Sequence, residues 1–66
     1  MKYIFEIVNV PWYNSTVDVW PEGEPENKTR LLVLNFRSPA GIHQEKLIEV
    51  LKIRFSLEEV EVEQAS

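Results

Sequence analysis

The sequence predicts an α+β domain in which one helix packs on one face of a small three- to four-stranded sheet. Apolar residues alternate with period two in several short stretches, whereas they recur at helical spacing in one stretch only. The predicted order along the chain is β-β-β-α-β. Residues 1–66 form a single domain, near the lower size limit for a chain without disulfides or bound metal.

Residues 2–10 are expected to form the first strand, because apolar side chains occupy both of its faces. One face is apolar throughout and consists of Tyr3, Phe5 and Ile7. The other face, which Lys2 and Glu6 interrupt, carries Ile4, Val8 and Val10. Pro11 then ends the strand, since proline donates no hydrogen bond to a sheet.

Residues 16–20 form a short second strand that we expect at an edge of the sheet. Its valines, Val17 and Val19, face opposite to Asp18 and Trp20. Residues 21–28 have two prolines, a glycine and three glutamates, so this segment is expected to be a solvated loop.

Residues 29–37 form the third strand, with Leu32, Leu34 and Phe36 on one side and Leu31 and Val33 on the other. A strand that is apolar on both sides usually lies in the interior of a sheet. We therefore expect it to have a neighbour on each side.

The helix is expected from about Gln44 to Phe55, with Ser38 as a candidate N-cap and Pro39 at the first helical position. Its apolar stripe consists of Leu47, Ile48, Leu51 and Phe55. The last strand lies within residues 58–64, where Val60 and Val62 face inward and glutamates face outward.

One helix of this length covers only one side of the sheet. The other side retains either the face of Tyr3, Phe5 and Ile7 or that of Ile4, Val8 and Val10, each with part of the third strand. Soluble monomers rarely leave such a patch in water, so a folded-back loop, a second copy of the chain or another protein is expected to cover it.

The candidate partner-binding residues are aromatic, because tryptophan and tyrosine are enriched at the anchoring points of interfaces. They are Trp12, Tyr13, Trp20, Tyr3 and Phe5. An alternative surface is acidic and consists of Glu58, Glu59, Glu61 and Glu63, whose spacing resembles a ladder of phosphates.

Enzymatic activity is not expected. His43 is the one histidine, and nothing near it in the sequence completes a mechanism. No cofactor or metal site is expected either, since the chain has no cysteine and its acidic loop fits no calcium-binding pattern.

The net charge of −4 disfavours direct binding to nucleic acid or to an anionic membrane. No stretch has the length of an apolar membrane span, and no signal peptide is evident, so the expected location is cytoplasmic.

These observations predict a small acidic interaction protein that binds and modulates or inhibits a larger protein. Its character would suit an accessory factor of a phage or mobile element, and a homodimer is expected. Two alternatives remain: a small homo-oligomer that binds a metabolite or ion between its subunits, and an acidic mimic of nucleic acid.

Overall fold

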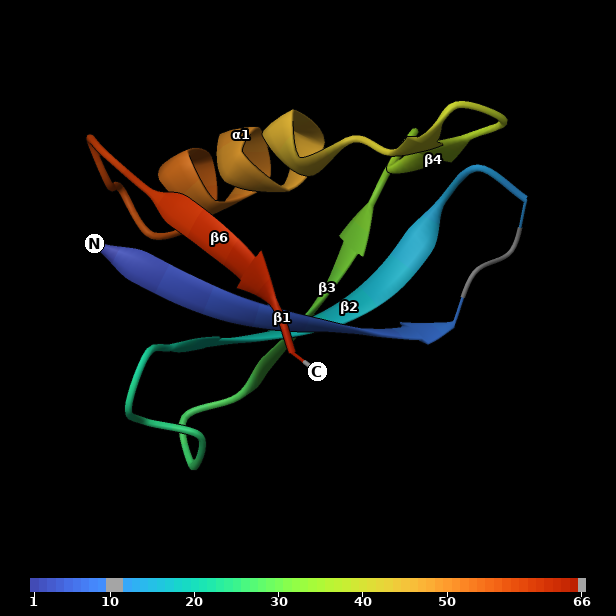
Figure 1. Ribbon diagram of the computed structural model, residues 1–66. Coiled ribbons are helices and arrows are strands. Elements are labelled where there is room, and N and C mark those ends of the chain that lie inside the picture. Colours follow the sequence, from blue (N-terminus) through green and yellow to red (C-terminus); the bar gives the residue numbers. More distant parts are fainter. Residues whose placement is uncertain (10–11, 66) are drawn as a thin grey trace.

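A computed structural model describes residues 1–9 and 12–65 and shows one helix lying across a twisted four-stranded sheet (Figure 1). The main sheet consists of β1 (Lys2–Asn9), β2 (Ser15–Pro21), β3 (Thr29–Val33) and β6 (Glu61–Gln64). A small hairpin of β4 (Arg37–Ser38) and β5 (Gly41–Ile42) precedes the helix α1 (Gln44–Arg54). The predicted α+β class and the single helix are confirmed.

The strands of the main sheet follow the order β3-β2-β1-β6. β2 is antiparallel to both β1 and β3, whereas β6 is parallel to β1, with Tyr3 opposite Val62. The chain therefore leaves the sheet at one edge and returns at the other. The connection from β3 to β6 contains α1 and covers one face of the sheet on the way.

The core lies between α1 and the sheet face beneath it. Its fully or nearly buried apolar residues are Tyr3, Phe5, Val17, Val19, Leu31, Val33, Phe36, Leu47 and Leu51. The ring of Phe36 meets that of Phe5 edge to face at a centroid distance of 5.8 Å. The ring of Tyr3 stacks on Phe55, with 5.7 Å between centroids. Leu47 and Leu51 of the predicted helical stripe thus close the core as expected.

The predicted positions of two strands in the sheet are wrong. β2, which was expected at an edge, pairs on both sides, and β3, which was expected in the interior, is an edge strand. β2 tolerates an interior place although it carries Asp18, because Arg30 of β3 lies directly opposite and binds that carboxylate. Charge on a strand therefore did not identify the edge.

The expected strand over residues 29–37 ends at Val33. Asn35 has a φ of 57°, in the left-handed region, which turns the chain and reverses the alternation of side chains. Phe36 consequently joins Leu31 and Val33 in the core, whereas Leu32 and Leu34 are left exposed.

The expected helix start at Ser38 and Pro39 is also wrong. These residues belong to the β4–β5 hairpin, and Ser38 Oγ accepts a hydrogen bond from the backbone N–H of Ala40 across its turn. His43 is the N-cap residue of α1, and its side chain makes no capping hydrogen bond. The serine hydroxyl thus stabilises a turn, which is the other common use of this residue type.

The sheet face away from α1 remains uncovered within the described residues. It carries the apolar side chains of Ile4, Trp20 and Leu32, as the alternation predicted. A row of charged residues crosses its middle, however, where Asp18 lies between Glu6 and Arg30. The apolar surface is therefore divided, and its most exposed part lies at one end of the sheet.

Candidate functional site

The exposed apolar residues at this end come from two segments that lie side by side. We call them the end cluster; it consists of Trp12, Tyr13, Leu32 and Leu34. Two hydrogen bonds join the segments: the backbone N–H of Arg37 donates to the carbonyl of Tyr13 at 2.9 Å, and the N–H of Asn35 donates to Asn14 Oδ1 at 3.0 Å. The cluster therefore rests on a fixed backbone.

Every member of the end cluster is more than half exposed. The exposed fraction is 90% for Trp12, 55% for Tyr13, 58% for Leu32 and 59% for Leu34. An indole this exposed contributes almost nothing to the core, and large apolar side chains in water favour association. Trp12 also has a left-handed backbone, with a φ of 57°, which is unusual for a bulky residue.

The structure separates the aromatic residues that the sequence grouped together. Trp12 and Tyr13 lie in the end cluster, but Trp20 lies towards the other end of β2, half-buried opposite Ile4. The ammonium group of Lys28 sits 4.8 Å from the centroid of the Trp20 ring, a cation–π contact that covers one face of the indole.

Tyr3 and Phe5 must be removed from the predicted binding surface. Their exposed fractions are 7% and 0%, because α1 covers the face to which they belong. The sequence left open which face of the first strand the helix would take, and the structure places it over this one.

The predicted acidic surface is distributed over two elements. Glu58 and Glu59 precede β6, whereas Glu61 and Glu63 lie on it and are exposed. Lys2 Nζ lies 3.0 Å from Glu63 Oε1 and 3.5 Å from Glu22 Oε2, and these carboxylates, Glu63 above all, raise the pKa of Lys2. The row of carboxylates is therefore partly neutralised.

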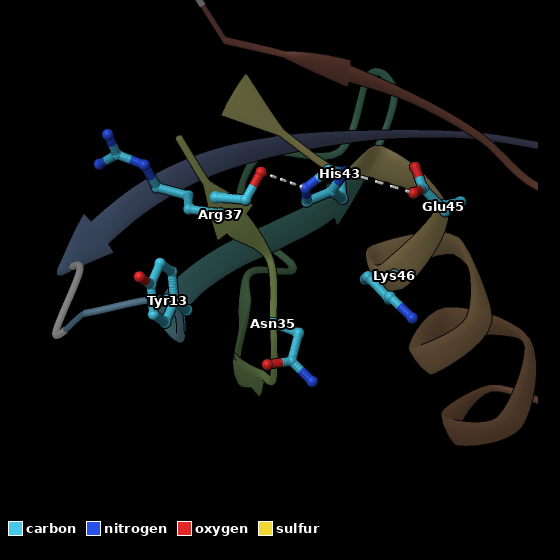
Figure 2. Close-up of a pocket in the computed structure, with 7 residues that line it drawn as sticks. Tyr13, Asn35, Arg37, His43, Glu45 and Lys46 are labelled. Carbon is cyan, nitrogen blue, oxygen red and sulfur yellow. Dashed lines mark hydrogen bonds and ion pairs between the residues drawn. The ribbon is translucent and has the colours of Figure 1, made fainter. Parts of the chain in front are cut away.

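A groove of about 340 Å³ opens beside the end cluster, at the start of α1 (Figure 2). Its lining includes two cations and an imidazole and consists of Tyr13, Asn35, Arg37, Ser38, His43, Glu45 and Lys46. Figure 2 shows Tyr13 on the side opposite Lys46, with His43 between them and the Arg37 side chain extending outward. Tyr13 thus belongs to both the end cluster and the groove.

Three side chains of the groove form a connected line. His43 Nε2 lies 2.7 Å from Ser38 Oγ, and His43 Nδ1 lies 3.5 Å from Glu45 Oε1. A proton on Nδ1 suits the nearby carboxylate, which leaves Nε2 to accept from the serine hydroxyl. Sequence reasoning missed this line, because it placed Ser38 at a helix start instead of across a hairpin from His43.

The order of hydroxyl, imidazole and carboxylate is the one that activates a serine in hydrolases. Here the line also has a structural effect, since it joins the β4–β5 hairpin to the first turn of α1. Ser38 Oγ already accepts from Ala40, and the Glu45 side chain is 65% exposed and makes only a long contact with the ring. The geometry therefore favours a role in fixing the shape of the groove.

Residues 1–9 and 12–65 contain no group of three or more histidine, aspartate or glutamate side chains that could hold a metal ion. Over the same residues, no helix combines the length and apolar character needed to cross a membrane. No protein-family model, curated protein or solved structure matches this chain significantly.

Proposed function

We propose that this chain is a non-enzymatic interaction protein that docks on a larger protein through the end cluster and the edge strand β3, and modulates or inhibits it by occupying that surface. The observation that carries the proposal is the exposure of Trp12 at 90%, together with that of Leu32 at 58% and Leu34 at 59%. A tryptophan in this position is a typical anchor of a protein interface.

The edge strand β3 supports the same conclusion. It pairs with β2 on one side only. Leu32 on the strand and Leu34 directly after it are both exposed. Extended segments of partner proteins add to such edges through backbone hydrogen bonds, while exposed side chains select the partner.

The size of the molecule is compatible with this mode of binding. A standard interface buries ~800 Å² on each partner. The accessible surface of the described chain is 4502 Å², so such an interface would occupy roughly a fifth of it. The end cluster and the β3 edge together would form its centre, with Arg37 and the polar hairpin at its rim.

Self-association is a second candidate, and β3 favours it. Two copies of β3 related by a twofold axis would pair antiparallel and bring Leu32 of each copy near its counterpart. The combined sheet would have no free β3 edge. Self-association and binding of another protein exclude one another only if both use the same edge.

The proposal is tested with tagged protein and three variants. Trp12→Ala and Leu32→Glu remove an anchor and place a charge on the edge, and we expect each to weaken partner capture by about 30-fold, as for interface hot spots. Ile53→Glu is the matched control, because Ile53 is 83% exposed on α1, away from the cluster. Circular dichroism checks that all three variants fold.

Light scattering separates the two candidates. A wild-type dimer that Leu32→Glu converts to monomer supports pairing through β3, whereas a monomer whose capture of a larger protein depends on Trp12 supports docking. A wild-type monomer whose capture is equal in all three variants excludes the end cluster. Reversal of charge at Glu58, Glu59, Glu61 and Glu63 tests the acidic mimic, since apolar docking should respond little to it.

A further inference from the structure

The positive charges of this acidic protein are divided between paired and unpaired groups. Lys2 and Arg30 bind carboxylates, and Lys28 lies against Trp20. Among the described residues, Arg37 and Lys46 make no ion pair, yet both line the groove. The groove thus has two cations that form no ion pair, together with one carboxylate, that of Glu45.

We propose that this groove binds a small aromatic oxyanion, with its phosphate or carboxylate group at Lys46 and its ring against Tyr13. Arg37 also lines the groove, and Figure 2 shows its guanidinium extending outward from it, away from Lys46. The phenol ring of Tyr13 is 55% exposed and provides an apolar wall, on which a planar ligand stacks.

The volume and the chemistry of the groove agree with such a ligand. Its 340 Å³ lies at the lower end of the range for small-molecule sites, about 300–1,000 Å³, so it suits a single ring with one anionic group. Apolar contact with a few fixed polar groups is the usual composition of these sites. The hydrogen bond from Ser38 to His43 holds two of the polar groups in place.

The net negative charge of the whole chain makes the groove a more favourable place for an anion than the rest of the surface. At a net charge of −4, most of the surface repels an anion, and two cations without an ion pair make the electrostatic potential at the groove more positive than elsewhere, which favours an anion there. Glu45 opposes binding, because its carboxylate lies at the same groove and faces His43. Removal of the Glu45 carboxylate should therefore strengthen binding of the anion, whereas removal of either cation should weaken it.

The experiment is an NMR titration of the ¹⁵N-labelled chain with phenyl phosphate, inorganic phosphate and benzoate at constant ionic strength. We expect shifts of the amides of residues 35–46 and dissociation constants on the order of 1 mM for phenyl phosphate. Arg37→Gln and Lys46→Gln should each weaken binding about three- to tenfold, and Glu45→Gln should strengthen it by a similar factor.

Matched controls come from the other end of α1. Lys52→Gln and Arg54→Gln remove exposed cations of the last helical turn and should leave the affinity unchanged. Tyr13→Ala should abolish the advantage of phenyl phosphate over inorganic phosphate.

Two results would overturn the assignment. One is the absence of saturable shifts near the groove; the other is an equal loss of affinity in the Lys46 and Lys52 variants, which would indicate only diffuse attraction. Neither result bears on the docking role, because that test uses Trp12 and Leu32, which do not line the groove.

Discussion

The two edge strands of the sheet differ in both charge and anchoring. β6 presents exposed glutamates, Glu61 and Glu63, and its one inward valine, Val62, is only half-buried. β3 presents exposed Leu32, whereas its inward side chains, Leu31 and Val33, are almost completely buried. The β6 edge is thus acidic and less deeply buried, whereas the β3 edge is anchored in the core and carries an exposed leucine beside a single charge, that of Arg30.

This difference indicates which edge is suited to a partner. Charged residues on an edge discourage pairing with other chains. β6 presents two exposed glutamates, whereas the one charged residue of β3, Arg30, is paired with Asp18 of β2. A firmly anchored strand also provides a rigid template, because partner binding then costs little ordering of the chain. The comparison therefore supports the choice of β3, and the following experiments are designed to break or refine it.

The largest effect is expected from the core beneath the β3 side. Phe36→Ala removes a fully buried ring from its edge-to-face contact with Phe5 and should cost about 3–5 kcal/mol. For a domain of this size that loss approaches the whole free energy of unfolding. Val62→Ala on the β6 side should cost only about 1 kcal/mol. Urea denaturation followed by circular dichroism measures both, and equal losses would refute the difference in anchoring.

The next effect concerns the protection of the β6 edge. Glu61→Leu removes an exposed charge without a described ion partner and should allow this edge to pair, with a gain of about 1.5–3 kcal/mol if the leucine is buried. Sedimentation velocity should then show association that the wild-type β6 edge does not support. Glu58→Leu serves as the control, since Glu58 lies outside the strand. Association of both variants to the same extent would indicate nonspecific hydrophobic association and not pairing of the β6 edge.

A smaller effect is expected at Ser15, which lies on β2 opposite Val33 of the β3 edge. Its hydroxyl is fully buried, and no hydrogen-bond partner for it exists among the described residues. Ser15→Ala should raise the free energy of unfolding by about 1 kcal/mol, because it removes an unsatisfied polar group. Thermal unfolding measures the change. A loss of stability would show that the hydroxyl has a partner, such as a bound water.

The smallest effects are expected from two ion pairs, those of Asp18 and Lys2, whose contributions to stability depend on pH in opposite directions. Arg30 bonds the carboxylate of Asp18 and lowers its pKa below 3.8, so this β2–β3 contact stabilises the fold above the unfolded pKa and is lost as the pH falls through the folded one. The raised pKa of Lys2 acts in the opposite direction. Its contact with β6 is complete below pH 10.5 and is lost as the pH rises through the folded pKa.

Two substitutions check this assignment by measuring the free energy of unfolding against pH. Asp18→Asn should flatten the acid limb only, and Lys2→Met should flatten the alkaline limb only. Both pairs are exposed enough to be screened, so the changes should shrink in high salt. If Asp18→Asn altered the alkaline limb instead, the pairing across β2 and β3 would be wrong.

The sequence alone was sufficient for the helix and the four strands of the main sheet, and for the faces of most of them, but not for the β4–β5 hairpin. Alternation in residues 2–10 separated Tyr3 and Phe5 from Ile4 and Val8, and helical spacing located α1 through Leu47 and Leu51. These patterns are local, because the period of a side-chain row follows directly from the backbone geometry of a strand or helix. The solvated loop after β2 was predicted for the same reason, from proline, glycine and charge.

Only the tertiary structure decided which strands are neighbours and which residues form a site. Alternation specifies the face of a side chain but not the strand beside it, so the positions of β2 and β3 in the sheet were predicted wrongly. The left-handed turn at Asn35 is a single-residue event that changes the fate of Phe36 and exposes Leu34. The approach of Ser38 to His43 likewise depends on a hairpin that has no clear signal in its sequence. The strand order and the hydrogen bond from Asn35 to Asn14 are set by contacts between distant segments, about which a local pattern contains no information.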